Sequence, residues 1–337
     1  MGRFCLIGLI AFLAIAYVGI GLGMYHYMKR ITVNGKPLIE QPVNEQEKTD
    51  KLGIGEFLVY FSMIIIGGIC AIQIMQNGGV GSAILARSII LPPIMALFNA
   101  RKRTGKALLA LIVSFMLALF LVMTYFIIGV PRKAPTLTVN DSTITIAQTT
   151  AAEIMSDGFD IYIKQGSNPG VKYNELLLSG TFKKYSANRS VFVEKGFREN
   201  NDAVPEAPYI LVKDDVVIGS IGLYGSKTKD TVLEDCKIIH FKLNEDCIVA
   251  AKANSISCAF NGIDLFAPLK GEELREKFGE KLWHTPINAK EITEGWYGIK
   301  WTNHSEHLFW NEYYSCICFD EKNNMISFEL MSRIAGE

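Results

Sequence analysis

The stretch RKRTGKALLALIVSFMLALFLVMTYFIIGV, residues 101–130, decides the layout of this chain. It opens with a cluster of lysine and arginine residues and continues as an uncharged run from Ala107 to Val130. A helix of roughly 20 apolar residues is long enough to cross the hydrocarbon core of a bilayer. The run therefore predicts a membrane-spanning helix, and no comparable apolar stretch follows it.

Two further apolar runs precede this one. Phe4–Met28 and Phe57–Ala86 carry no charged residue, and the turn-forming stretch Gln76–Ser82 divides the second run. We therefore expect an α-helical transmembrane anchor over residues 1–130, with spans at about 4–28, 57–75, 83–100 and 107–130. The third of these contains Arg87 and Pro92-Pro93, so a three-span alternative with a re-entrant or interfacial segment stays open.

The basic cluster predicts the orientation of the anchor. Loops rich in lysine and arginine stay in the cytoplasm, so the span that follows Arg101–Lys106 runs outward. Residues 131–337 are then extracytoplasmic under either count of spans. With four spans the loop Lys29–Gly55 is cytoplasmic, and with three it is outside. This loop is itself basic, which favours four spans.

Charge is distributed unevenly although it sums to zero. The chain has 34 Lys/Arg and 34 Asp/Glu residues. Residues 1–130 are net positive and residues 131–337 are net negative. Proteins that bind nucleic acid carry a basic patch that meets the phosphates, so the acidic region predicts no nucleic-acid partner.

Short alternating segments typical of β-strands begin after Pro131. Thr136–Val139 and Thr143–Ile146 flank the turn Asn140-Asp141 and predict a hairpin. Thr149–Met155 starts with capping residues and predicts a short helix that ends near Gly158. A second hairpin is predicted at residues 209–212 and 216–221.

A similar order of segments returns about 120 residues later. A strand and turn at residues 260–266 precede the predicted helix Lys270–Phe278, and three strands follow, at 296–301, 313–319 and 325–330. The fold class is therefore a transmembrane region followed by an α+β soluble region. We expect the latter to contain two repeats of a short helix plus antiparallel sheet, at 131–250 and 251–337.

The pairs Gly158-Phe159 and Phe278-Gly279 mark the ends of the two predicted helices. A strand, a short helix ending in such a pair and an antiparallel meander together resemble the module shared by beta-lactamase inhibitor protein and small outer-membrane lipoproteins. Residues 1–130 resemble uncharacterised membrane proteins of low-GC Gram-positive bacteria. The resemblance implies an extracytoplasmic binding or assembly module rather than an enzyme.

Aromatic residues gather near the C-terminus and form the first candidate binding site. Large rigid rings are favoured in recognition of proteins and carbohydrates, although the same rings could fill the core of a subdomain. The residues of this candidate face are Trp296, Tyr297, Trp301, Trp310 and Tyr314.

A second candidate is a zinc site at His304, Glu306 and His307. Their spacing differs from the His-Glu-x-x-His order of helical metalloproteases, and a solvated turn is the alternative. The sequence predicts no cofactor and no catalytic centre, because neither a phosphate-binding loop nor a nucleophile elbow is present.

Five cysteines follow the last apolar run: Cys236, Cys247, Cys258, Cys316 and Cys318. An odd number cannot pair completely, so one or two disulfides or none remain open. The first three recur at a regular interval. As strand residues they could be a redox pair with one spare thiol or small buried hydrophobic residues, and the second interpretation is favoured. Cys316 and Cys318 would share one strand face, where they lie too close for a relaxed disulfide. With His304 or His307 they could complete a metal site.

These patterns together predict a membrane-anchored, extracytoplasmic binding or scaffolding protein of the bacterial cell envelope. Its partners would be the lipid bilayer and an envelope protein or glycan. The alternatives are a metal-dependent envelope hydrolase that uses His304, Glu306 and His307, and a small transport-associated membrane subunit.

Overall fold

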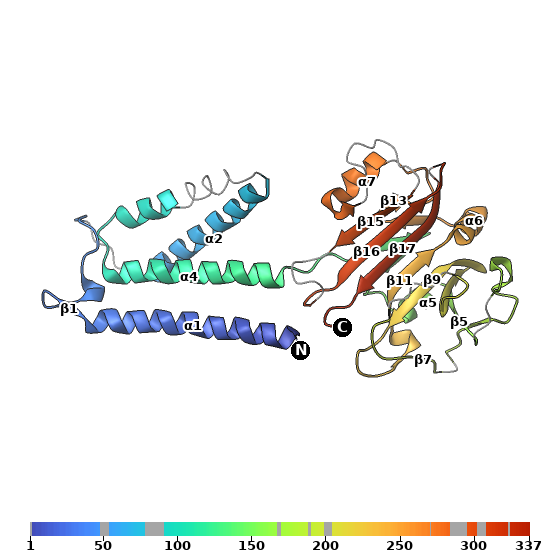
Figure 1. The fold of residues 1–337 in the computed structure, drawn as a ribbon, viewed down its shortest axis with the longest axis horizontal. Coiled ribbons are helices and arrows are strands. Elements are labelled where there is room, and N and C mark those ends of the chain that lie inside the picture. The colour runs from blue at the N-terminus through green and yellow to red at the C-terminus, as the bar shows by residue number, and fades with distance from the viewer. Residues whose placement is uncertain are drawn as a thin grey trace. The chain divides into compact units, whose positions relative to one another are not determined.

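A computed structural model describes residues 2–47, 54–77, 91–166, 170–187, 190–198, 204–269, 271–283, 295–301, 308–322 and 324–337. The chain divides into two compact units, Met1–Gly129 and Val130–Glu337 (Figure 1). The first unit is helical, and the second mixes short helices with large antiparallel sheets.

Long apolar helices make up the first unit. They are α1 (Gly2–Arg30), α2 (Ile54–Asn77) and α4 (Gly105–Ile128), and residues 91–99 are also helical. α4 packs against both α1 and α2, for example through the rings of Tyr17 and Phe120, whose centroids lie 5.4 Å apart. Within the described residues, Phe4–Arg30 and Gly105–Tyr125 are long and apolar enough to cross a membrane, and Glu56–Ile69 is a shorter apolar helix.

The helices coincide with three of the expected apolar segments. Residues 4–28 fall within α1, 57–75 within α2, and 107–128 within α4, which ends two residues before the expected boundary. Of the expected segment 83–100, residues 83–90 lie outside the described part of the chain. The described helices therefore cover three of the expected segments and residues 91–99 of the fourth.

A hydrogen-bonded loop closes one end of the helical unit. It contains β1 (Thr32–Val33), β2 (Lys36–Pro37) and the 3-10 helix η1 (Leu38–Glu40). Its backbone meets the start of α4, because Val43 N–H donates to the Arg103 carbonyl and Gly105 N–H donates to the Gln41 carbonyl. The segments that follow α1 and precede α4 therefore lie together.

Arg103 is buried at this end of the unit. Its Nη1 lies 2.5 Å from Glu56 Oε1, and the Tyr60 hydroxyl donates to the same oxygen at 2.7 Å. Arg103 also donates to the carbonyls of Leu97 and Phe98. A buried guanidinium is stable only when it is paired and hydrogen-bonded, and here α2 and the 91–99 helix together supply its partners.

A nine-stranded antiparallel sheet forms the framework of the second unit, in the order β14-β15-β16-β17-β11-β9-β8-β5-β6. Its strands are β5 (Phe159–Lys164), β6 (Phe182–Lys184), β8 (Tyr209–Lys213), β9 (Val216–Tyr224), β11 (Lys237–Leu243), β14 (Leu282–Trp283), β15 (Gly295–Trp301), β16 (Glu312–Phe319) and β17 (Met325–Arg333).

A four-stranded sheet of order β13-β12-β3-β4 packs against this framework. Its strands are β3 (Thr136–Val139), β4 (Ser142–Thr145), β12 (Cys258–Phe260) and β13 (Ile263–Asp264). A further pair joins β7 (Phe192–Val193) and β10 (Thr231–Val232). The helices of the unit are α5 (Ala151–Ser156), α6 (Glu245–Ala253) and α7 (Gly271–Phe278), with 3-10 turns η2 (Tyr173–Glu175), η3 (Leu233–Asp235) and η4 (Gly279–Lys281).

The expected hairpins and helices of this unit are confirmed. β3 pairs with β4, β8 with β9, and β16 with both β15 and β17. α5 starts at a capping box of Thr150 and Glu153. Sequence reasoning missed β11 and α6, the strand and helix that follow Cys236, because their apolar residues show no clean alternation or turn signal.

The β17–β11 pair lies at the middle of the nine-stranded sheet. Outward from it, one side runs β17, β16, β15, β14 and the other runs β11, β9, β8, β5, β6. In the small sheet, Asn261 Oδ1 accepts from the backbone of Thr136, and Asn140 Oδ1 accepts from the backbone of Ser257, both at 2.9 Å. These reciprocal bonds hold β3 and β12 together.

The core lies between the two sheets. Phe260 of β12 contacts Phe328 of β17, with ring centroids 5.0 Å apart, and Phe278 of α7 at 5.5 Å. Cys236, Cys247 and Cys258 are free and buried in the same core. Only Cys258 lies in a strand, so the strand interpretation of the other two was wrong. Burial raises the pKa of Cys236 to about 11 and that of Cys247 and Cys258 to about 12, which leaves their thiols protonated and unreactive.

We expect Arg103→Met to destabilise the helical unit by roughly 3–5 kcal/mol, because it leaves the buried Glu56 carboxylate without its partner. The double variant Arg103→Met/Glu56→Gln should recover much of this loss, since Gln can still accept from Tyr60. Lys106→Gln, which removes an exposed charge, is the control. The measurement is loss of helical circular dichroism as a denaturing detergent is added to the full chain. Equal losses for Arg103→Met and Lys106→Gln would contradict the expectation.

Candidate functional site

A cavity of about 480 Å³ opens in the second unit and is the candidate functional site. We call it the basic pocket. Its volume lies within the usual range for sites that hold small ligands. It is lined by Pro131, Arg132, Lys133, Ala134, Pro135, Thr136, Asn261, Lys277, Phe278, Lys281 and Trp301.

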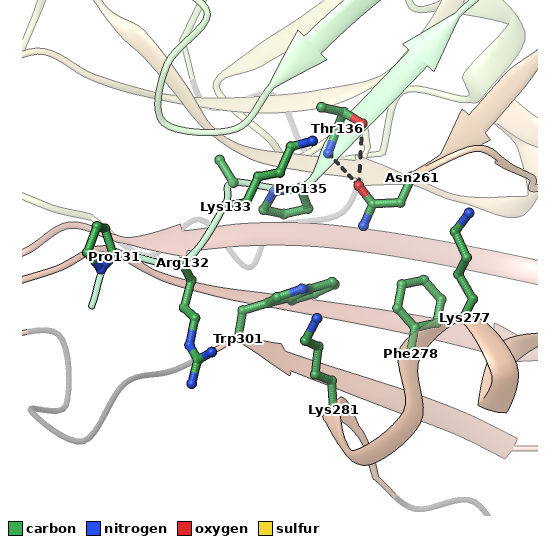
Figure 2. A pocket seen from close by; sticks show the side chains of 11 residues that line it. Pro131, Arg132, Lys133, Pro135, Thr136, Asn261, Lys277, Phe278, Lys281 and Trp301 are labelled. Carbon is green, nitrogen blue, oxygen red and sulfur yellow. Dashed lines mark hydrogen bonds between the residues drawn. The ribbon is translucent and has the colours of Figure 1, made fainter. Parts of the chain in front are cut away.

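Four segments far apart in the sequence build the basic pocket. Residues 131–136 lead into β3, and Asn261 lies in the turn between β12 and β13. Residues 277–281 end α7 and form η4, and Trp301 ends β15. Asn261 adopts a left-handed backbone with φ of 47°, which an asparagine tolerates in a tight turn. This conformation lets its Oδ1 accept from both the N–H and the hydroxyl of Thr136, at 2.9 and 3.3 Å (Figure 2).

Aromatic rings form one wall of the basic pocket. Trp301 is only 6% exposed and meets Phe260 and Phe278 edge to face, with ring centroids 5.9 Å apart in both pairs. The indole therefore belongs to the core on one side and to the pocket on the other. A rigid ring anchored in this way gives the pocket a fixed apolar surface.

Positive charge dominates the rest of the lining. Lys133, Lys277 and Lys281 are exposed, as is Arg132, and none of the described lining residues is acidic. Lys281 Nζ lies 6.0 Å from the centre of the Trp301 ring, at the outer limit of a cation–π contact. Figure 2 shows Lys281 and the Trp301 ring together, and Arg132 extending to the other side of the 131–136 segment from Lys133.

Such a lining is suited to an anion. Lysine ammonium groups bind phosphate and carboxylate as point charges, and a cavity with charge of one sign concentrates counter-ions. Lys277 also has a structural role, because a cation in the last turn of α7 offsets the negative end of the helix dipole. That role accounts for the position of Lys277, whereas Lys281 lies beside the Trp301 ring.

The aromatic residues expected to form one binding face are divided by the structure. Tyr297 and Trp301 are 3% and 6% exposed, so both belong to the core, as the alternative interpretation had it. Tyr297 packs on Phe319 at 5.6 Å. Trp296 precedes Tyr297 in β15, and its side chain lies outside the described part of the structure. Trp310 is half-buried in the segment that leads into β16.

Tyr314 lies away from these core rings, because it is next to Tyr313 in β16 and successive residues of a strand face opposite ways. Its hydroxyl donates to Glu312 Oε2 at 2.6 Å, and Lys300 and Arg333 lie over its ring, each 5.3 Å from the ring centre. Burial, together with this hydrogen bond, raises the pKa of Tyr314 above its ordinary value. The aromatic side chains of this set that the structure describes therefore do not share a single face.

The candidate zinc ligands His304, Glu306 and His307 lie outside the described residues. Among those that are described, no three His, Cys, Asp or Glu side chains come together as a metal site. Sequence reasoning also missed the basic pocket. The signal was Arg132-Lys133 directly after the last apolar helix, but nothing in the sequence brings Lys277 and Lys281 to it.

We expect Trp301→Ala to destabilise the second unit by roughly 3–5 kcal/mol, because it opens a cavity beside Phe260 and Phe278. Trp310→Ala removes a half-buried ring and should cost less. Urea unfolding of the full chain in detergent, followed by near-ultraviolet circular dichroism, measures both. If the two variants unfold at the same urea concentration, Trp301 does not anchor the core as the structure indicates.

The chain was compared with protein-family models, curated proteins and solved structures, and nothing matches it. The interpretation of the basic pocket therefore depends on its own geometry.

Proposed function

We propose that this chain is a membrane-anchored binding protein whose second unit captures an anionic ligand in the basic pocket, close to the membrane surface. The observation that carries the proposal is the position of the pocket in the chain. α4 ends at Ile128 and the pocket lining begins at Pro131. Three residues of chain span at most roughly 11 Å, so the pocket entrance is tied to the end of the apolar helix.

The surface of the first unit supports a location in the membrane. Large apolar side chains along α1 are exposed, among them Phe4, Phe12 and Ile15. α4 also exposes Phe115 and Leu119. Contiguous apolar surface of this extent is costly in water and favourable in lipid, so α1 and α4 are best accounted for as spans.

The hydrogen bonds between Val43 and Arg103 and between Gln41 and Gly105 bear on the topology. They require the end of α1 and the start of α4 to lie on the same side of the membrane. The chain between them must then cross an even number of times, which favours the four-span arrangement over the three-span one. Because basic loops stay inside, residues 131–337 and the basic pocket are extracytoplasmic in this arrangement.

The ion pair between Arg103 and Glu56 does not change the expected orientation of α4. The charge of Arg103 is neutralised by Glu56, so it adds little to the basic loop. Arg101, Lys102 and Lys106 remain there, and the loop bonded to it contributes Lys29, Arg30 and Lys36. Arg132 and Lys133 are fewer and lie beyond the other end of α4.

The lining residues favour binding over catalysis. The described part of the pocket offers cations, an amide, a hydroxyl and an aromatic wall, but no carboxylate or histidine that could act as a general base. The ligand we propose is a phosphodiester. At the membrane surface it could come from a lipid headgroup or from an anionic envelope polymer, which share this chemistry. The recurring order of elements that the sequence predicts is consistent with the binding or assembly module that the resemblance implies.

Cysteine labelling tests the topology. Val33→Cys, in the loop after α1, and Asp141→Cys, in the exposed β3–β4 turn, are made in a variant that has Ser at Cys5, Cys70, Cys316 and Cys318. A membrane-impermeant maleimide added to intact bacterial cells should label Asp141→Cys. Val33→Cys should react only after the cells are permeabilised. Labelling of Val33→Cys in intact cells would contradict the four-span arrangement.

Charge removal tests the pocket. A fluorescent glycerol phosphate oligomer is titrated into the full chain in phosphatidylcholine nanodiscs, and its anisotropy is followed. Lys277→Gln/Lys281→Gln should weaken binding at least tenfold, because a hydrogen bond to a charged group contributes about 1.5–3 kcal/mol. Lys229→Gln/Lys322→Gln removes the same charge from exposed sites outside the pocket and should bind as the unmodified chain does.

Nanodiscs that contain phosphatidylglycerol distinguish the two sources. If the headgroup is the ligand, the lipid competes and the oligomer binds more weakly than in phosphatidylcholine. If the polymer is the ligand, its affinity is unchanged by the lipid. Equal weakening by the two double variants would show general attraction to positive charge and would overturn the pocket as the binding site.

A further inference from the structure

A pair of thiols lies on the nine-stranded sheet, apart from the basic pocket. Cys316 and Cys318 occupy alternate positions of β16, so their side chains point to the same face. Their sulfur atoms are 3.9 Å apart, and both residues are half-buried. The other described cysteines of the second unit are buried in the core, so this pair is the accessible one among them.

The sheet holds the two sulfurs in place. β16 is paired on both sides, with Cys316 opposite Gly298 of β15 and opposite Glu329 of β17. Cys318 is opposite Ser327. Cys318 is also opposite Trp296 of β15 in register. A strand with partners on both sides has little freedom to move, so the backbone fixes the spacing of the pair, and neither cysteine is fully buried.

Polar groups surround the pair on the same face. Glu329 lies beside Cys316 in register, and its Oε1 is 2.7 Å from His240 Nε2 of β11. Burial opposes ionisation of Glu329, but the hydrogen bond from His240 and the charges of His240 and Lys242 lower its pKa overall. His240 is 3% exposed, and its Nδ1 has no hydrogen-bond partner among the described residues. A buried ring nitrogen without a hydrogen-bond partner is unusual in proteins and is typical of functional sites.

The two thiols lie within hydrogen-bonding distance of each other. Thiolate is the form that binds metal ions.

The distance between the two sulfurs distinguishes a disulfide from a shared metal ion. A disulfide requires about 2.05 Å between sulfurs, and residues two apart on an extended strand reach this only with strain. One ion bound to both sulfurs requires a wider gap. Two metal–sulfur bonds of about 2.3 Å place the sulfurs up to roughly 4.6 Å apart when the two ligands lie opposite each other, as a soft ion with two ligands favours. The 3.9 Å between the two sulfurs is close to this distance and far from that of a disulfide, so a small rotation of the side chains would admit the ion.

We propose that Cys316 and Cys318 form a two-sulfur site for a soft metal ion of the copper(I) class. Soft thiolates select such ions, which are satisfied by few ligands. Zinc prefers four, and the described residues bring no three metal-binding side chains together. Binding releases one proton from each thiol and forms two metal–sulfur bonds, with no change in oxidation state. Lys242, opposite Glu329 in register, lies where it offsets the negative charge of the complex.

The test is a copper(I) titration of the reduced full chain in detergent, without oxygen, against a chromophoric copper(I) chelator. We expect one equivalent of copper per chain to resist the chelator. Cys316→Ser and Cys318→Ser should each lower the affinity at least tenfold. Cys5→Ser, which removes an exposed thiol of α1, and Ser327→Ala, which alters the neighbour of Cys318 without removing sulfur, should retain it.

Alkylation gives a second measurement that needs no variant. Copper(I) should protect the peptide containing Cys316 and Cys318 from iodoacetamide, as seen by mass spectrometry, and zinc at the same concentration should not. Three outcomes would overturn the proposal. They are copper retained equally by both Cys→Ser variants, zinc held as strongly as copper, and a disulfide that forms between the two thiols in place of metal binding.

Discussion

The antiparallel pairing of β11 with β17 is the contact on which the second unit depends. It joins a run of four strands, β14 to β17, and a run of five strands, β11 to β6, into one sheet, and it brings Phe241 and Phe328 into a shared core. The reciprocal bonds of Asn140 and Asn261 join the small sheet in the same manner. Neither half could bury its apolar face alone, because the rings that fill the core come from both. The unit is therefore cooperative across its two halves.

The helical unit has a different constraint. Its helices pack through buried apolar side chains such as Tyr60, Phe98 and Ala107, and a few polar contacts hold one end together. There Arg103 pairs with Glu56 and donates to the carbonyls that end the 91–99 helix. A charge in that place must be paired or solvated, and the pairing brings helices from three parts of the chain together. Backbone hydrogen bonds between Val43 and Arg103 and between Gln41 and Gly105 hold the loops after α1 and before α4 together. These bonds bear on how often the chain between the two helices crosses the membrane.

The two proposed sites use opposite chemistry. The basic pocket presents cations around the Trp301 ring, next to the end of α4 in the chain, and is suited to a hard anion. The thiol pair presents soft ligands on β16, with Glu329 and Lys242 beside it. β15 contributes to both, since Trp301 lines the pocket and Gly298 lies opposite Cys316. Pairing with strands on both sides keeps β15 in place beside each site.

The sequence by itself determined the apolar helices, most hairpins and the division near residue 130, because hydrophobic runs and turn residues are local signals. It also predicted the recurring order of elements in the soluble region. It could not reveal β11 as the central strand, because its partners β9 and β17 are defined by long-range pairing. Adjacent Trp296 and Tyr297 looked like one aromatic surface, but Tyr297 and Trp301 are buried in the core. Only the tertiary structure brought Lys277 and Lys281 to Arg132 and Lys133, since charge proximity across such distances in the chain leaves no trace in local pattern.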